Sequence, residues 1–133
     1  MWKRNIPLVD TNIALRYILG DNPELSPKAR DILDNNIVEV PIEVIPEIIY
    51  ALQKGYKISR DEIAKLLPKF FDDIECIVPQ KAIILKALEV FASTSLDFVD
   101  CILAASAILD GRPIITFDVK LQKFINRQME VYE

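Results

Sequence analysis

The sequence predicts an α/β fold in which helices pack on a small parallel sheet. Short apolar segments rich in β-branched residues alternate with longer segments whose apolar residues recur at helical spacing. Strands that alternate with helices are joined by crossovers, which make neighbouring strands parallel. The chain has 133 residues without a repeat, linker or low-complexity stretch, so residues 1–133 are expected to form a single domain.

Local signals in the first half predict two strands and four helices. Residues 5–9 and 37–40 are short apolar runs typical of strands. The first helix should follow at residues 11–19 and end at Gly20, and the second should start with Ser26 as N-cap and Pro27 in its first turn. Pro41 should open a third helix that runs to about residue 54 and either kinks or restarts at Pro46. A capping box at residues 59–62 should start the fourth helix.

The second half predicts strands at residues 74–78 and 113–117, with a possible edge strand at residues 130–132. A helix should begin at Pro79, and its apolar residues up to Phe91 lie on one face. Residues 97–110 should form a largely buried helix that stops at Gly111, and residues 120–126 a last helix.

Composition excludes several kinds of chemistry. The chain has no histidine, so the usual general base, zinc ligand and activator of a serine or cysteine nucleophile are absent. A net charge of −4 provides no broad basic surface, so contact with nucleic acid would be local or assisted by metal. No apolar run approaches the roughly 20 residues that span a bilayer, and no secretory signal is evident. We therefore expect a cytoplasmic protein with no membrane contact.

Acidic residues within apolar segments are the main candidates for a functional site. Asp10 and Asp118 each follow a predicted strand, and the carboxyl ends of parallel strands line a ligand crevice. Each also stands where a helix N-cap is wanted, so a structural role is equally well supported. Asp100 lies inside an apolar helix, where a carboxylate needs compensation. Asp97, three residues earlier, is either the N-cap or a further acid of the same site.

Glu47 lies one helical turn after Glu43, and such a pair is ordinarily a solvated face. Thr11, Asn12 and Thr116 flank the acids and could orient a carboxylate or a metal-bound water, although cap and turn hydrogen bonds explain them equally well. A cluster of carboxylates with only oxygen ligands would favour Mg²⁺ or Mn²⁺ over zinc.

These residues occur in motifs that resemble a PIN domain, in particular the stand-alone VapC-like toxins. The motifs are 8–12 (LVDTN), 15–17 (LRY), 46–52 (PEIIYAL), 96–100 (LDFVD) and 115–118 (ITFD). The resemblance spans essentially the whole chain in order. It implies a three-layer α/β/α sandwich with a parallel sheet and a Mg²⁺- or Mn²⁺-dependent endoribonuclease. It also implies a homodimer held inactive by a small antitoxin protein, as in a type II toxin-antitoxin pair.

The resemblance also assigns roles to individual residues. Asp10 would be the first metal ligand, Glu47 the second acid, and Asp100 and Asp118 the third and fourth, with Asp10, Asp100 and Asp118 as metal ligands. Glu43 could replace Glu47 if Pro46 shifts the helix. Supporting roles would fall to Asn12, Thr11, Asp97 and Thr116. Cleavage of RNA by an acidic protein would also need basic residues near the site mouth, for which the candidates are Arg16, Lys120 and Lys123.

Two other functions compete with this hypothesis. A non-catalytic binding or regulatory module would use the acids only as helix caps. Phosphoryl transfer through an aspartyl phosphate would need Asp10 as nucleophile, and Asn12 stands where such phosphatases usually have a second aspartate. The leading hypothesis remains hydrolysis of RNA phosphodiesters by a metal-activated water.

Overall fold

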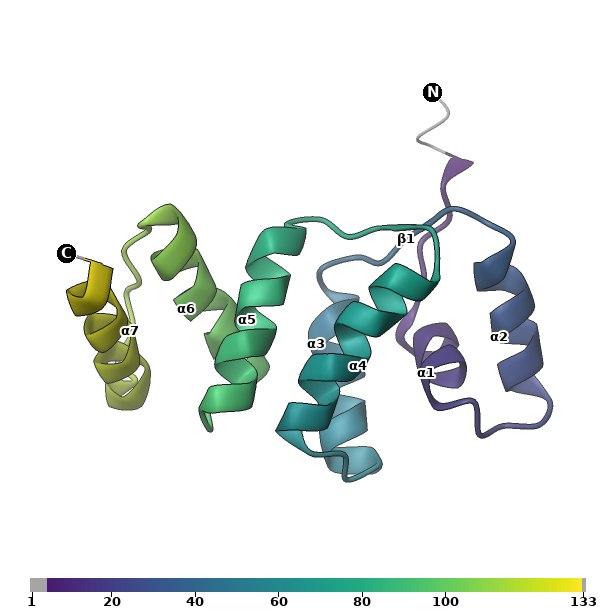
Figure 1. Cartoon of the computed structure of the whole chain (residues 1–133), viewed down its shortest axis with the longest axis horizontal. Coiled ribbons are helices and arrows are strands. Elements are labelled where there is room, and N and C mark those ends of the chain that lie inside the picture. The colour runs from purple at the N-terminus through teal and green to yellow at the C-terminus, as the bar shows by residue number, and fades with distance from the viewer. Residues whose placement is uncertain (1–4, 133) are drawn as a thin grey trace. The chain divides into compact units, whose positions relative to one another are not determined.

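The structure of the protein is a computed structural model that describes residues 5–132, with side chains up to residue 129. The chain forms two compact units, Met1–Pro79 and Gln80–Glu133. The first contains the sheet and helices α1 to α4, and the second consists of α5, α6 and α7 (Figure 1). Helices thus combine with a small parallel sheet, which confirms the predicted PIN-like α/β class.

The sheet of the first unit pairs β1 (Val38–Glu39) with β2 (Cys76–Ile77) in parallel, with Val38 opposite Cys76. Leu8 adds an isolated parallel bridge to Glu39 on the other side of β1. The Val9 amide donates to the Glu39 carbonyl at 2.9 Å, and the Glu39 amide donates to the Pro7 carbonyl at 2.9 Å. The predicted strands at 37–40 and 74–78 are confirmed in shorter form, and the one at 5–9 is reduced to this bridge.

Helix α1 (Thr11–Leu19) has the bounds that the sequence predicts, because both of its ends are set by local signals. Asp10 caps its start, and Gly20 adopts the left-handed conformation at its end with φ 61°. Helix α2 (Leu25–Asp34) starts before the predicted Ser26 cap. The Asn22 side chain instead accepts from the Leu25 amide at 2.8 Å, and the buried Ser26 hydroxyl donates to the Arg16 carbonyl at 2.8 Å.

Helix α3 (Val44–Tyr50) continues directly into a π-helical segment, η2 (Ala51–Gly55). The predicted start at Pro41 was three residues too early, and the kink predicted at Pro46 was wrong in its position. Pro46 lies in the first turn of α3, where a missing amide hydrogen breaks no helical bond. The change in helical geometry comes after Tyr50, at a π-helix of the kind often found near functional sites.

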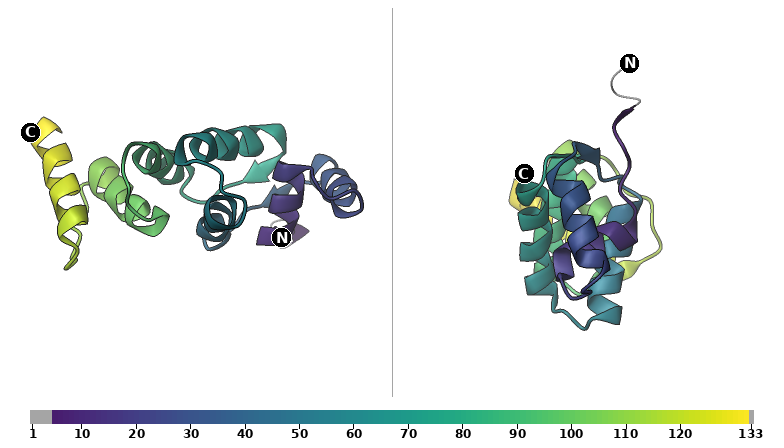
Figure 2. Two further views of the ribbon diagram at one scale, coloured as in Figure 1. Left: turned by 90° about the horizontal axis from the view of Figure 1, so that it is seen from below. Right: turned by 90° about the vertical axis from the view of Figure 1, so that its right-hand side faces the viewer.

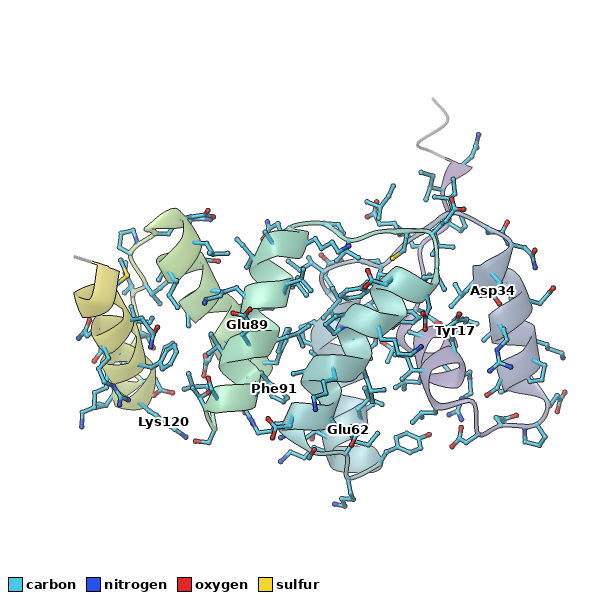
Figure 3. All side chains as sticks on the ribbon, viewed as in Figure 1. Tyr17, Asp34, Glu62, Glu89, Phe91 and Lys120 are labelled. Carbon is cyan, nitrogen blue, oxygen red and sulfur yellow. The ribbon has the colours of Figure 1, made fainter. Side chains whose placement is uncertain are left out.

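Helix α4 (Arg60–Asp73) begins as the predicted capping box requires, with the Ser59 hydroxyl accepting from the Glu62 amide at 3.2 Å. Tyr17 on α1 connects this helix with α2 (Figure 3). Its ring makes an edge contact with Phe70 of α4 at 5.6 Å between centroids, and its hydroxyl donates to Asp34 of α2 at 3.0 Å. Tyr17 therefore joins three helices of the first unit.

In the second unit, α5 (Lys81–Ser93) packs along α6 (Phe98–Asp110), and α7 (Val119–Tyr132) packs on α6 (Figures 1 and 2). The rings of Phe91 and Phe98 meet edge to face, with centroids 5.8 Å apart. Small buried residues on α6 allow the helices to approach closely. These residues are Cys101, Ala104, Ala105 and Ala107.

Two strands predicted in the second unit are wrong. Residues 113–117 form no strand and pair with no other segment within the described chain, and the side chains of Ile115 and Phe117 are fully exposed at 101% and 103%. The Thr116 carbonyl accepts from the Gln122 side chain at 2.6 Å, so it bonds to α7 rather than to a strand. Residues 130–132, predicted as an edge strand, lie within α7, because that helix continues past residue 126. A β-branched composition forms a strand only where a neighbour pairs with it.

Within the described residues, no single helix is both long and apolar enough to cross a membrane. Helices α5 and α6 are long and apolar enough for a membrane span only if they are counted as one segment, and that segment is bent by 119° at the break between them.

Candidate active site

Asp10 lies at the end of the segment that bridges to β1, in the position expected for a site at the carboxyl end of a strand. Its Oδ1 accepts from the Ile13 amide at 3.0 Å and so caps α1. The structural role anticipated for Asp10 is therefore confirmed. A carboxylate has two oxygens and about four acceptor positions, so this single bond leaves Oδ2 able to bind another group.

Glu47 is held beside the start of α1 by Thr11. The Thr11 hydroxyl donates to Glu47 Oε2 at 2.7 Å, a bond that joins α1 to the first turn of α3. Because Asp10 immediately precedes Thr11, this bond keeps the carboxylates of Asp10 and Glu47 at the same end of α1. Glu43 precedes α3 and has no such link among the described residues. The contact supports Glu47 rather than Glu43 as the second acid of this unit.

Replacing Thr11 with valine is expected to lower the free energy of unfolding by about 1 kcal/mol. Valine has a similar shape but cannot donate to Glu47, and a hydrogen bond to a charged group contributes about 1.5 kcal/mol or more to stability, which exposure to solvent reduces. Chemical denaturation should show the loss, and Thr11→Ser should restore most of it by returning the hydroxyl. Equal stability of the valine and serine variants would mean that the bond does not hold Glu47 in place.

Asn12 and Arg16 form a second polar contact on α1. Arg16 Nε donates to Asn12 Oδ1 at 3.3 Å, and its other nitrogens reach Asp21 at 3.5 Å and the Tyr56 hydroxyl at 3.3 Å. The Arg16 side chain is only 19% exposed. Its guanidinium is thus held by neighbours within the first unit, and it orients Asn12 from one helical turn away.

The second unit places three aspartates around the start of α6. Asp97 occupies the N-cap position but makes no capping bond with its side chain, so its carboxylate is not used as the cap that the sequence suggested. Asp100 lies in the first turn of the same helix. Burial raises the pKa of the Asp100 carboxyl above its ordinary value, and the negative charges of Asp118 and Asp97 raise it further. These three acids therefore lie close enough to repel one another.

Asp118 closes the loop that leads from α6 to α7. Its Oδ1 accepts from the Leu121 amide at 3.1 Å, so Asp118 caps α7, and its own amide donates to the Thr116 hydroxyl at 3.0 Å. Thr116 therefore makes an ordinary turn bond. That bond also fixes the backbone that carries Asp118, so the structural and functional roles are compatible for both residues.

Replacing Asp100 with asparagine is expected to stabilise the metal-free protein at neutral pH. A carboxyl whose pKa is raised in the folded state loses folding stability as the pH rises from its ordinary pKa of 3.8 through the folded value. The asparagine side chain carries no charge and would escape this penalty. Thermal unfolding in chelator should show a higher midpoint for Asp100→Asn at pH 7 and equal midpoints below pH 3.8. A lower midpoint at pH 7 would contradict the repulsion.

The side chains gathered in the two units fit a hard divalent cation in their donor chemistry. All the acids are oxygen ligands, and the repulsion around Asp100 is of the kind that a bound cation relieves. Within the part of the chain that the structure describes, no three His, Cys, Asp or Glu side chains come close enough to hold a metal ion. In the first unit Thr11 holds Glu47 beside the start of α1, next to Asp10. In the second unit Asp97 and Asp118 lie near enough to Asp100 to raise its pKa, but the three aspartates do not converge on one ion position.

Sequence reasoning missed a pocket in the second unit, whose lining residues Leu96 and Lys120 are near Asp97 and Asp118 in the chain. It has a volume of about 330 Å³. Its lining residues are Ser93, Thr94, Ser95, Leu96, Lys120, Phe124, Arg127 and Gln128. Lys120, Phe124, Arg127 and Gln128 are separated by four, three and one residues, a spacing that places them on one face of a helix. The predicted end of the helix at residue 126 hid that pattern.

Comparisons with known proteins agree with the motifs. Residues 8–125 match the model of the PIN domain. A curated protein named VapC ribonuclease, from Aquifex aeolicus (strain VF5), is 26% identical over 95% of this chain and 97% of its own length. No solved structure matches the chain significantly. Since the match to the family model covers most of the 133 residues, the chain belongs to the PIN domain family.

Proposed function

We propose that the protein is a divalent-metal-dependent endoribonuclease, the toxin of a type II toxin-antitoxin pair. The observation that carries the proposal is the group of Asp97, Asp100 and Asp118, in which burial and the charges of the other two aspartates raise the pKa of Asp100. Groups with perturbed pKa values concentrate at functional sites, because catalysis and ion binding use such environments. Membership of the PIN family and the likeness to a protein named VapC ribonuclease support the choice of RNA.

The catalytic acids would be Asp10 and Glu47 in the first unit and Asp100 and Asp118 in the second, and residues 1–133 would form one functional domain. Both pairs lie in segments within the PIN match. Asp10, Asp100 and Asp118 would hold Mg²⁺ or Mn²⁺. When bound, such an ion supplies an activated water and stabilises the leaving oxygen of a phosphodiester.

The remaining polar residues would position these acids. Thr11 fixes one oxygen of Glu47 and leaves the other to face the substrate side. Arg16 holds Asn12 next to Asp10. Asp97 adds negative charge beside Asp100 without being used as a cap, which increases the preference of the site for a cation.

The partners of the protein follow from this proposal. An RNA strand would be the substrate, and a small antitoxin protein would hold the toxin inactive in the cytoplasm. A homodimer would be the active form. Copurification of a small protein encoded beside this chain, together with sedimentation of the complex, would test the antitoxin and the dimer.

The proposed activity can be tested with a pool of end-labelled structured and unstructured RNAs. The purified protein should cleave RNA internally with Mg²⁺ or Mn²⁺ and should be silent in chelator. A DNA pool of the same sequences controls for a general nuclease. No cleavage of any RNA in either metal, with no metal binding by calorimetry, would contradict the proposal.

A second function, a non-catalytic binding or regulatory module, is favoured by one observation. Asp10 and Asp118 do cap α1 and α7, as that function requires. Asp100 lies in the first turn of α6, where a negative charge also favours the helix, although it neither caps that helix nor forms an ion pair among the described residues. A chain that binds a protein partner equally well as wild type and as Asp100→Asn, and cleaves nothing, would favour the module.

A further inference from the structure

We propose that the pocket between α5 and α7 is a subsite for single-stranded RNA, in which Lys120 and Arg127 bind backbone phosphate and Phe124 stacks on a base. The inference rests on the proposed ribonuclease function and names where its substrate strand would lie. The pocket is formed entirely within the second unit, by the end of α5, the loop after it and one face of α7.

The wall contributed by α7 combines charge with an aromatic ring. Lys120, Phe124 and Arg127 are separated by four and three residues, so they lie on one face of the helix, and Gln128 extends that face. Lysine binds phosphate as a point charge, and arginine binds it with two parallel hydrogen bonds from its planar guanidinium. Every base has a face that can stack on phenylalanine. A pocket lined by both cations and an aromatic ring has the groups that bind single-stranded nucleic acid.

Lys120 is in a position that local helix stability does not explain. It is in the first turn of α7, where the helix dipole disfavours a positive charge (Figure 3). No salt bridge is formed by Lys120 or Arg127 among the side chains that the structure describes. Lys69 and Lys86, by contrast, are each paired with an acid on their own helix. The charges that line the pocket therefore remain available to a ligand.

The opposite wall is a loop held in place by its own hydrogen bonds. The Thr94 hydroxyl donates to the Val90 carbonyl at 2.8 Å and accepts from the Leu96 amide at 3.3 Å. The Ser93 hydroxyl is likewise directed to carbonyls of α5. Ser95, which is exposed, makes no such bond among the described residues and can donate to a ligand. A wall fixed in this way loses little entropy when a ligand binds.

The pocket adjoins the acids of the same unit. Its residue Leu96 directly precedes Asp97, and Lys120 follows Asp118 by two positions. The end of α5 and the starts of α6 and α7 lie at the same end of this unit (Figure 1). A strand bound in the pocket would therefore lie at the same end of this unit as Asp97 and Asp118. Because the chain has a net charge of −4, a local group of cations is needed to hold an RNA strand beside three aspartates.

The test is binding of a fluorescently labelled single-stranded RNA, measured by anisotropy in chelator with the Asp100→Asn protein so that no cleavage occurs. Adding Lys120→Ala or Arg127→Ala should weaken binding about three- to tenfold and reduce the slope of log affinity against log salt by about 0.7 for each lost phosphate contact. Phe124→Ala should weaken binding about fivefold or more without changing the slope.

Lys81→Ala is the matched control, because Lys81 is an exposed lysine at the start of α5, in the same unit, that does not line the pocket. It should bind as the parent does, and Lys120→Arg should retain most of the affinity. Equal losses from Lys120→Ala and Lys81→Ala, or no RNA binding by the parent, would overturn the subsite.

The outcome also separates the subsite from the activity. Binding that depends on Lys120, Arg127 and Phe124, in a wild-type chain that cleaves no RNA in any metal, would retain the subsite and reject the nuclease. Metal-dependent cleavage whose KM is unchanged by all three alanine variants would retain the nuclease and reject the subsite.

Discussion

Asp100→Asn is expected to lower the rate of RNA cleavage by at least about a hundredfold while the protein remains folded. Asparagine keeps the shape of the side chain but removes the charge that a cation would meet, and the loss of one electrostatic contact at a reacting centre typically has this size. The repulsion that raises the Asp100 pKa shows that this charge is costly to the free protein. Activity and stability should therefore change in opposite directions.

The measurement is the initial cleavage rate at saturating Mn²⁺ for wild type and variant. Asp110→Asn is the matched control, since Asp110 is an exposed acid at the far end of the same helix and should leave the rate unchanged. A rate for Asp100→Asn within a few-fold of wild type would contradict a catalytic role.

Phe91→Ala is expected to lower the free energy of unfolding by about 3–5 kcal/mol. Phe91 is only 1% exposed, and its ring packs on Phe98 in the first turn of α6. Alanine would leave a cavity between α5 and α6 and loosen the helix start that carries Asp97 and Asp100. The same change should therefore reduce cleavage as well as stability.

Chemical denaturation gives the loss of stability directly from the shift in midpoint. Tyr50→Ala serves as the aromatic control, because Tyr50 is 66% exposed and its removal should cost less than about 0.5 kcal/mol. A loss below about 1 kcal/mol for Phe91→Ala would show that α5 and α6 do not share the core described.

The elements that local chemistry determines were predictable. Helix α1 has both of its predicted ends because Asp10 and Gly20 are caps, and α4 starts at the predicted Ser59. The strand at residues 113–117 failed because its composition favours an extended backbone but cannot supply a pairing partner. Residues 130–132 are likewise helical because α7 continues past the predicted end.

The candidate site was likewise predictable only where local signals determine a residue's role. The sequence singled out Asp10 and Asp118 and offered helix capping as one of their roles, which the structure confirms. Their catalytic role stays a prediction, because each carboxylate has one oxygen for the cap and another that can bind a further group. The choice of Glu47 over Glu43 needed the contact with Thr11, which joins residues far apart in the chain. The predicted kink at Pro46 obscured that choice by making the helix register uncertain.

The basic residues were the hardest to place from sequence. Arg16, Lys120 and Lys123 were equivalent candidates for the site mouth, and only packing distinguishes them. Arg16 is held by Asn12, Asp21 and Tyr56 within the first unit, whereas Lys120 lines the pocket beside the aspartates.

The central proposal is that Asp100 and Asp118 act together in metal-dependent cleavage, and a double-mutant cycle of Asp100→Asn and Asp118→Asn in the cleavage assay tests it most directly. Residues that act as a unit show strongly non-additive losses, because the first substitution already disables the site. We expect each single variant to lose at least about a hundredfold and the double variant to be no slower than the slower single variant. Losses that multiply in the double variant, or a wild-type rate in either single variant, would contradict the claim.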